Sequence, residues 1–197
     1  MISWTGSNKP IEKAGLIGCG RMGRCMLQSL LDRGFQVVAY DKFPAAAKSA
    51  EEMGAEAAAT PAELAERSSV ILLSLPGPAQ LQEVLFGEKG LKEGLTSDHV
   101  VIDTSTVDPA TTRFNAAGVE ETGAAYLDCP ILGRPSATGK WMLPTGGNPE
   151  ALHQVMPVLL TFAANAVSVG GHGAGNALKL LNQLMFSCIN AISSEVM

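Results

Sequence analysis

A glycine-rich stretch near the N-terminus constrains this chain more than any other feature. Residues 15–23 read GLIGCGRMG, an apolar segment precedes them, and an amphipathic helical pattern follows over residues 22–33. The glycines have the G-x-G-x-x-G spacing, which allows a tight strand-to-helix turn, close approach of a pyrophosphate and close helix packing. The helix then directs free N–H groups at the phosphates. We therefore predict a dinucleotide-binding loop. Its candidate residues are Gly18, Gly20, Arg21, Met22 and Gly23.

An acidic residue follows at the spacing that such a loop requires. The helix ends at Gly34, residues 36–40 (QVVAY) form an apolar strand pattern, and Asp41 comes directly after it. An acidic side chain roughly twenty residues beyond the glycines binds the ribose hydroxyls of NAD and repels the extra phosphate of NADP. Lys42 adjoins Asp41 and weakens that preference. We expect NAD as the cofactor and leave NADP open. The alternative, that Asp41 is only a polar residue at a strand end, fits the preceding elements less well.

Strand and helix patterns alternate along most of the chain. Strands are expected at residues 14–17, 36–40, 69–75, 100–103, 125–128, 141–143 and 166–169, and helices at 22–33, 44–53, from 60, at 108–121 and from 148. The run at 69–75 is apolar throughout, as a fully buried parallel strand is. Alternation of this kind predicts an α/β fold, a doubly wound parallel sheet with helices on both faces. We expect residues 1–13 to be a leader and residues 14–172 to be a Rossmann-type dinucleotide-binding domain.

The last segment has a different pattern. A glycine-rich turn at residues 170–175 leads into a helical run at 176–197 whose apolar residues cover most of its circumference. Such a helix is normally buried. We therefore expect a partner subunit or further C-terminal sequence to cover it, and a homodimer or higher homo-oligomer. The polar residues of this helix share one stripe. They are Lys179, Asn182, Gln183 and Asn190. The stripe faces solvent or lines a cleft, and the glycine turn before it favours the cleft.

Composition excludes several classes of partner. The 197 residues carry a formal charge of −5 without a basic stretch, which argues against nucleic acid and acidic membrane surfaces. Apolar runs are too short to span a bilayer, so we expect a soluble, cytoplasmic protein.

The four cysteines match no zinc or disulfide spacing, and we expect reduced, mostly buried thiols and no metal site. Cys19, at a helix N-terminus, is expected to have a lowered pKa and to oxidise easily. We expect His172 to be a loop residue.

Four motifs carry a resemblance to a known family. The first is residues 15–23 with Met26, similar to G-L-G-x-M-G-x-x-M but with Cys19 where leucine is usual, and the second is Leu75-Pro76. The third is residues 103–109 (DTSTVDP), similar to D-x-S-T-x-x-P. The fourth is residues 173–183 (GAGNALKLLNQ), similar to G-A-G-x-x-x-K-x-x-N. In this order they resemble the β-hydroxyacid dehydrogenases, which include 3-hydroxyisobutyrate dehydrogenase and tartronate semialdehyde reductase. The resemblance covers nearly the whole chain. It implies that residues 173–197 are the first helix of an all-helical C-terminal domain that this sequence only begins.

The resemblance also implies roles for individual residues. Leu75 and Pro76 lie beside the cofactor, and Thr106 lies near the nicotinamide ribose. Lys179 acts as the acid/base, Asn182 positions the substrate oxygen, and Gln183 supports them. The reaction itself requires such an acid/base. Hydride transfer to or from a carbinol carbon is accompanied by gain or loss of a proton at the neighbouring oxygen. Burial lowers the pKa of a lysine toward the working range. The alternative is a lysine that extends from a buried helix toward solvent.

One motif departs from the family pattern. Residues 128–135 read DCPILGRP where the family typically has D-A-P-V-S-G-G, so Leu132 replaces the serine that binds the substrate carboxylate. Gly133 still offers a backbone N–H, and Arg134 can pair with a carboxylate through two hydrogen bonds. Alternatively, Arg134 is a surface loop residue and the substrate is less polar. Both interpretations stay open at this point.

The sequence therefore supports one leading function and two alternatives. The leading one is an oxidoreductase that transfers a hydride between NAD(H) and a small β-hydroxy acid or its semialdehyde. We expect the substrate to carry a carboxylate. An imine or uncharged-carbonyl reductase of the same fold is favoured by Leu132. A non-catalytic dinucleotide-binding module is the third hypothesis, and Lys179 argues against it, since pure binding needs no proton donor.

Overall fold

The computed structural model describes residue 11 and residues 13–196. The elements in chain order are β1 (Lys13–Ile17), α1 (Arg21–Asp32), β2 (Gln36–Tyr40), α2 (Pro44–Met53), β3 (Glu56–Ala57), α3 (Pro61–Glu66), β4 (Val70–Leu73), α4 (Pro78–Phe86), α5 (Leu91–Gly94), β5 (Val100–Asp103), α6 (Pro109–Glu120), β6 (Ala125–Asp128), the 3₁₀ helix η1 (Pro135–Ala137), β7 (Trp141–Gly147), α7 (Pro149–Leu159), β8 (Ala163–Gly170) and α8 (Ala174–Val196). Most of the expected leader lies outside the described residues. Its last residue, Lys13, belongs to β1 instead.

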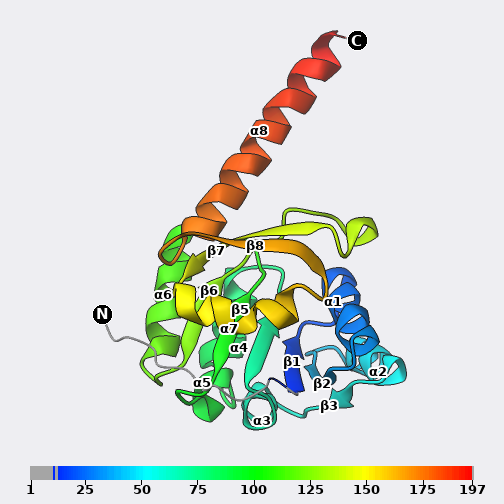
Figure 1. Cartoon of the computed structure of the whole chain (residues 1–197), viewed down its shortest axis with the longest axis vertical. Coiled ribbons are helices and arrows are strands. Elements are labelled where there is room, and N and C mark those ends of the chain that lie inside the picture. The colour runs from blue at the N-terminus through cyan, green and yellow to red at the C-terminus, as the bar shows by residue number, and fades with distance from the viewer. Residues whose placement is uncertain (1–10, 12, 197) are drawn as a thin grey trace.

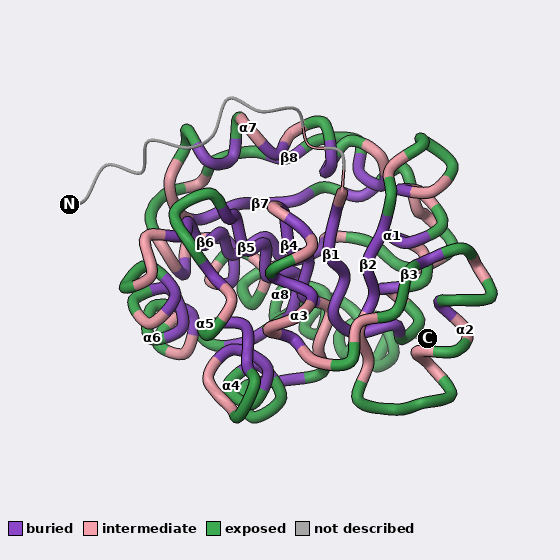
Figure 2. The backbone as a smooth tube through the Cα atoms, turned by 90° about the horizontal axis from the view of Figure 1, so that it is seen from below, coloured by how far each residue is buried: buried purple, intermediate pink, exposed green. Residues whose placement is uncertain are grey.

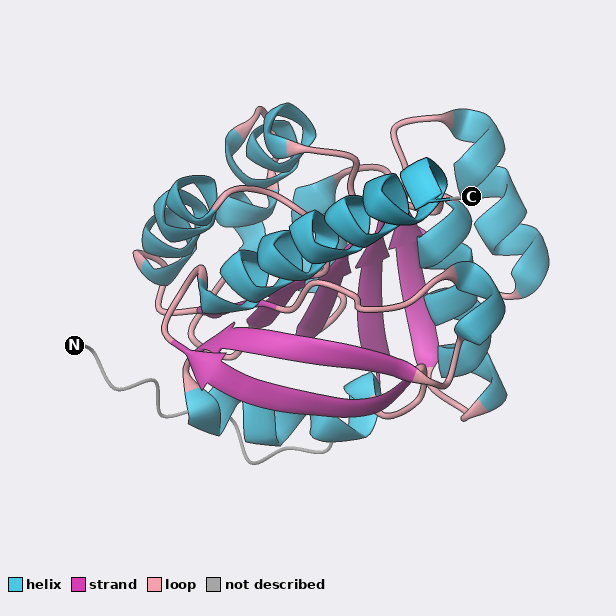
Figure 3. Ribbon diagram, turned by 90° about the horizontal axis from the view of Figure 1, so that it is seen from above, coloured by secondary structure: helices cyan, strands magenta, loops and turns pink. Residues whose placement is uncertain are grey.

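The strands form one sheet in the order β3-β2-β1-β4-β5-β6-β7-β8. Neighbouring strands from β3 to β6 are parallel, which confirms the predicted Rossmann-type fold. The prediction of a wholly parallel sheet is wrong at one position, because β7 runs antiparallel to β6. The connection between them contains only loop and η1, without the α-helix that a parallel return usually has. The strands β7 and β8 are longer than expected and lie side by side, parallel to each other (Figure 3).

Helices cover both faces of the sheet, and each face has its own apolar core. Adjacent strand residues such as Leu16 and Ile17 point to opposite faces, because side chains alternate along a strand. Leu16 belongs to the core that α1 and α7 cover, and Ile17 belongs to the core that α3, α4 and α6 cover. The central strands are accordingly buried throughout, as Figure 2 shows. This two-sided burial explains the continuous apolar runs in the sequence.

Several helix starts follow the sequence signals. The side chains of Thr60, Asp108 and Asn148 each accept hydrogen bonds from the first turn of α3, α6 and α7, with a proline at the start of each helix. The sequence predicted helices that begin at these three positions. The elements α4, α5 and β3 were not predicted, because they are short and lie among glycines and prolines.

The last helix, α8, begins two residues before the predicted start and extends away from the body of the molecule (Figure 1). Only its first turns contact the sheet, and its apolar side chains farther along are exposed, with 67% of Leu181 and 65% of Ile192 accessible. Among the described residues, no helix has both the length and the apolar character needed to cross a membrane.

Candidate active site

The glycine loop between β1 and α1 has the geometry that a dinucleotide requires. Gly18 has φ of +94°, and a Cβ there would lie 2.2 Å from the Ser74 carbonyl oxygen. A Cβ on Gly23 would lie 1.9 Å from the Gly18 oxygen, so the helix start packs against the loop itself. A Cβ on Gly20, in contrast, would meet no atom within 4 Å. Gly20 precedes α1 and no side chain caps the helix there. The first N–H groups of α1 therefore face an open approach, and the loop fits a pyrophosphate.

Asp41 lies beside this loop at the end of β2. Its Oδ2 accepts a hydrogen bond from the Cys19 N–H at 2.7 Å, and its Oδ1 accepts one from the Phe43 N–H at 2.9 Å. The carboxylate is thus held next to the glycine turn, where the ribose of a dinucleotide is expected. Burial, together with the charge of Asp41, raises the pKa of Cys19 to about 12. The prediction of a low-pKa, easily oxidised Cys19 is therefore wrong, because a buried position beside a carboxylate disfavours the thiolate.

The loops after β4 and β5 are joined by hydrogen bonds from Leu75 to Asp103. The Leu75 N–H donates to Ser105 Oγ at 3.0 Å, and the Ser105 N–H donates to Asp103 Oδ1 at 2.9 Å. The Tyr126 hydroxyl donates to Asp103 Oδ2 at 2.7 Å. Burial raises the pKa of Asp103 to about 6. This buried network brings the Leu75-Pro76 segment and the loop that carries Thr106 to the same edge of the sheet.

Leu75 is half-buried, and Pro76 and Thr106 are exposed at that edge. Arg21 is exposed at the start of α1, and Met22 is half-buried. The carboxyl ends of β1, β2, β4 and β5 therefore collect the predicted cofactor residues, as expected for parallel strands. Their contacts with a cofactor remain predictions.

The start of α8 is held by Asp128, the last residue of β6. Asp128 Oδ1 accepts from the Gly173 N–H at 2.9 Å, and Oδ2 accepts from the Asn176 N–H at 3.0 Å. The Asn176 side chain is buried and links onward: Oδ1 accepts from the Val107 N–H at 3.2 Å, and Nδ2 donates to Thr112 Oγ1 at 3.1 Å. The positioning roles of Asp128 and Asn176 were not predicted from the sequence. The signal was an aspartate that ends a wholly apolar strand, since a buried carboxylate needs donors.

Lys179 lies on the second turn of α8. Its ammonium donates to the Ile131 carbonyl oxygen at 2.7 Å, and burial lowers the pKa of this half-buried side chain. Ile131 directly precedes Leu132, so the helix brings the predicted acid/base to the predicted substrate loop. Asn182 lies three residues on and is half-buried, whereas Gln183 is exposed. Across the described residues, the Asn182 and Gln183 side chains make no hydrogen bond, and their roles remain predictions.

The substrate loop is fixed mainly through its backbone. Leu132 pairs with Met142 in an isolated antiparallel bridge, with N–H to O distances of 2.9 and 3.2 Å. A Cβ on Gly133 would lie 2.2 Å from the Trp141 ring, and the Trp141 Nε1–H donates to the Arg134 carbonyl oxygen at 2.8 Å. The Arg134 side chain is exposed and has no ion-pair partner within the described part of the chain. Both interpretations of Arg134 are therefore still open.

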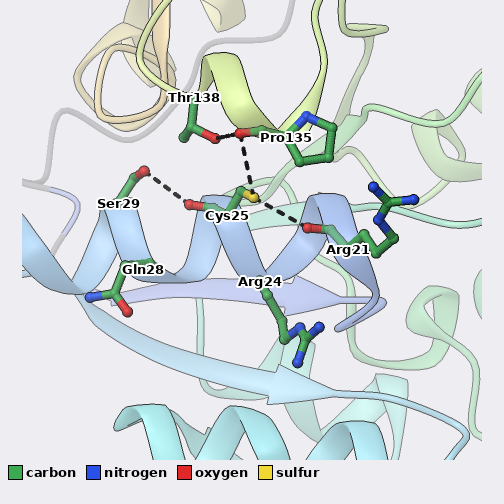
Figure 4. A pocket seen from close by; sticks show the side chains of 7 residues that line it. All are labelled: Arg21, Arg24, Cys25, Gln28, Ser29, Pro135 and Thr138. Carbon is green, nitrogen blue, oxygen red and sulfur yellow. Dashed lines mark hydrogen bonds between the residues drawn. The ribbon is translucent and has the colours of Figure 1, made fainter.

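A cleft of about 430 Å³ lies between α1 and η1, beside this site (Figure 4). Its lining residues are Arg21, Arg24, Cys25, Gln28, Ser29, Pro135 and Thr138. The Cys25 and Ser29 side chains lie on the side of α1 that faces Pro135 and Thr138, and Arg24 points away from them. Lys179 does not line the cleft, so we place the chemistry at the strand ends and not in this cavity.

Residues 13–196 include no group of three histidine, cysteine or acidic side chains that is placed to hold a metal ion. His172 Nε2 lies 2.8 Å from Glu120 Oε1 on the molecular surface. This contact is consistent with the expectation of a loop residue.

The glycine loop, the acidic residue after β2 and the uncapped start of α1 define a dinucleotide-binding domain of the Rossmann type. Residues 13–171 match the family described as the NAD binding domain of 6-phosphogluconate dehydrogenase, and the chain belongs to this family. The expectation of an NAD-binding domain is thereby confirmed.

Individual relatives agree with the predicted resemblance. Over 182 residues, the chain is 37% identical to 3-sulfolactaldehyde reductase from Escherichia coli (strain K12), a match that covers 91% of this chain and 61% of that protein. The structure of 3-hydroxyisobutyrate dehydrogenase from Mycobacterium tuberculosis with L-serine is similar, with a TM-score of 0.84, 25% identity, and coverage of 90% of this chain and 60% of that chain. The resemblance to β-hydroxyacid dehydrogenases is confirmed.

An imine reductase from Streptomyces aurantiacus also has a similar structure, with a TM-score of 0.82 and 25% identity, covering 88% of this chain and 61% of that chain. The chain thus spans about three fifths of the length of these relatives, at 61%, 60% and 61%. The activity of the whole protein is therefore argued below as a proposal.

Proposed function

We propose that the protein is an oxidoreductase that transfers a hydride between NAD(H) and a small β-hydroxy acid or its semialdehyde. The observation that carries this proposal is the position of Lys179, whose ammonium is half-buried and donates at 2.7 Å to the backbone of Ile131 beside the substrate loop. A domain that only binds a dinucleotide needs no proton donor at this position. Similarity to 3-sulfolactaldehyde reductase and to 3-hydroxyisobutyrate dehydrogenase supports the same class of reaction.

The residues proposed to hold the cofactor come from the carboxyl ends of four parallel strands. They are Gly18, Gly20, Arg21, Met22, Gly23, Asp41, Leu75, Pro76 and Thr106. The open approach at Gly20 supports binding of the pyrophosphate at the start of α1. Asp41 is proposed to bind the adenosine ribose, which favours NAD.

Lys179 is proposed to move the proton that the reaction requires. When bound, the nicotinamide supplies or takes up the hydride. In reduction, the Lys179 ammonium donates a proton to the substrate oxygen, and in oxidation the neutral amine accepts it. Burial lowers the pKa of Lys179, which makes the neutral amine more accessible near neutral pH. The Ile131 carbonyl orients the ammonium, and Asn182, one turn on, is proposed to position the substrate oxygen with Gln183 in support.

The substrate is proposed to carry a carboxylate. The Gly133 N–H donates no hydrogen bond within the described residues, and the Arg134 guanidinium there is unpaired, so both are free to bind an anion. Together they replace the hydroxyl that Leu132 lacks. Leu132 itself favours the second candidate function, reduction of an imine or an uncharged carbonyl, and the similarity to an imine reductase supports it. A cytoplasmic location and a homo-oligomeric assembly remain predictions from the sequence.

The test is oxidation of NADH or NADPH by the protein with a panel of glyoxylate, succinic semialdehyde, tartronate semialdehyde, methylmalonate semialdehyde and a cyclic imine. We expect turnover of a carboxylated semialdehyde with NADH. Turnover of the imine alone would replace the leading proposal with the second one. Binding of NADH without any turnover would leave a dinucleotide-binding module.

The variant Lys179→Ala tests the acid/base role directly. We expect kcat to fall by about 10²- to 10⁴-fold, the usual contribution of a general acid/base, while NADH affinity measured by fluorescence titration stays the same. The control is Lys48→Ala in α2, which removes an exposed lysine that pairs with Glu52 of the same helix. Unchanged turnover in Lys179→Ala would refute the assignment.

A further inference from the structure

The sequence leaves the choice between NAD and NADP to two adjacent residues of opposite charge. Asp41 ends β2, and its carboxylate is held by the N–H groups of Cys19 and Phe43. It repels a phosphate on the adenosine ribose. Lys42 follows it and would attract the same phosphate. The sequence favours NAD because of Asp41, but it does not show how far Lys42 weakens that preference.

The structure supplies a third charge at this position. Lys42 Nζ lies 2.6 Å from Glu83 Oε1, and Glu83 belongs to α4, the helix that follows β4. Hydrogen bonding to Glu83 raises the pKa of Lys42, so the lysine stays charged. Its positive charge is therefore offset by a carboxylate that is 41 residues away in the sequence. Both side chains are exposed, at 66% and 56%, so a ligand can reach the pair.

We propose that Glu83 is a specificity-determining residue. By pairing with Lys42, it prevents that cation from binding the 2′-phosphate of NADP, and the protein therefore prefers NAD. This inference rests on the proposed function only in that the ligand is a dinucleotide bound at the glycine loop. The net charge of Asp41, Lys42 and Glu83 together is negative. A 2′-phosphate that approaches Lys42 must displace a carboxylate and remain beside it.

The expected size of the effect follows from the exposure of the pair. Exposed ion pairs contribute little to stability, so losing the pair leaves the fold intact. Two like charges a few ångströms apart near a protein surface nevertheless change a binding constant by about three- to ten-fold. Salt screens such exposed charges. The effect should therefore fall as ionic strength rises.

The experiment compares two ligands that differ only in the phosphate. Dissociation constants of ADP-ribose and 2′-phospho-ADP-ribose are measured by calorimetry with the native protein and Glu83→Gln. We expect Glu83→Gln to bind the 2′-phosphorylated ligand about three- to ten-fold more tightly, with unchanged affinity for ADP-ribose. The gain should shrink in 0.5 M salt, at which the screening length is only a few ångströms.

Two further variants show which residue acts. Glu121→Gln removes the carboxylate of another exposed pair, with Lys92, and should change neither constant. Adding Lys42→Met to Glu83→Gln should abolish the gain, because the freed cation is what binds the phosphate. Equal changes for both ligands, or an unchanged ratio in Glu83→Gln, would overturn the proposal.

The measurement separates this inference from the proposed reaction, because it requires no turnover. A shift in the ligand ratio without hydride transfer to any substrate would support the role of Glu83 and refute the proposed reaction. Turnover with NADH but no shift would refute the role of Glu83 alone.

Discussion

Two helices of this molecule begin after glycine-rich turns, and they use those turns in opposite ways. At the start of α1 no side chain caps the helix, and the position of the Gly20 Cβ is open. At the start of α8 the N–H groups of Gly173 and Asn176 donate to the buried carboxylate of Asp128. The first turn keeps its donors for an anionic ligand, and the second uses them to fix the helix. Similar glycine content therefore does not indicate similar function.

The fixed start of α8 gives Lys179 its position. The helix approaches the strands closely, because a Cβ on Gly175 would lie 2.5 Å from the Pro144 oxygen and 2.6 Å from the Asp128 oxygen. Beyond this first part, α8 extends into solvent. The precision needed at Lys179 thus comes from one buried carboxylate and from the close approach of the helix backbone at Gly175.

The largest effect is expected from Asp128→Ala, which removes the carboxylate at the α8 start. Two buried N–H groups would lose their acceptor, at about 1–3 kcal/mol each, so we expect the free energy of unfolding to fall by about 4 kcal/mol. Urea denaturation measures this change. The control is Asp108→Ala at the exposed start of α6, which should cost about 1 kcal/mol. Equal losses in the two variants would mean that the α8 cap has no special importance.

The next effect concerns Asp103, which pairs in register with Asp128 on the neighbouring strand. Burial raises the pKa of Asp103 from 3.8 to about 6. The Asp103 carboxyl group therefore stays protonated to a higher pH in the folded state than in the unfolded chain. The free energy of unfolding falls as the pH rises from about 4 to about 6. The loss amounts to at most about 3 kcal/mol.

Asp103→Asn removes this titration and should flatten that part of the pH profile. The free energy of unfolding is measured by urea denaturation from pH 4 to pH 7, and the difference between native protein and variant is compared. Asp128 also has a raised pKa, and its charge is one cause of the raised pKa of Asp103, so the difference reports the titration of Asp103 together with its coupling to Asp128. A difference that does not change with pH would contradict the raised pKa of Asp103.

The smallest effect distinguishes the two glycine turns themselves. Gly20→Ala should leave stability nearly unchanged, because its Cβ meets no protein atom within 4 Å. The methyl group would occupy the approach of the pyrophosphate, so NADH affinity should fall at least about tenfold. Gly171→Ala places a methyl group in equally open space in the other turn and should not affect affinity. Fluorescence titration of both variants measures this, and equal affinities would mean that Gly20 does not face the cofactor.

Much of the fold could be predicted from the sequence, because its signals are local. The G-x-G-x-x-G spacing, the strands at 36–40, 100–103 and 125–128, and the starts of α3, α6 and α7 depend on neighbouring residues and lie within one residue of where they were expected. The antiparallel direction of β7 was missed, since it depends on the pairing of Leu127 with Gly147 and not on any local pattern. The predicted lowering of the Cys19 pKa was wrong for the same reason. The burial of Cys19 and its contact with Asp41 arise only in the folded chain.

The sequence by itself determined that this protein is an α/β dinucleotide-binding domain, since periodicity and glycine spacing act within a few residues. Its four motifs added the resemblance to the β-hydroxyacid dehydrogenases. Only the tertiary structure decided which charges and donors meet: Asp128 with the start of α8, Lys179 with Ile131, and Lys42 with Glu83. These contacts join residues about 40 or more positions apart. Such pairs are brought together by strand order and helix packing, which no local pattern specifies.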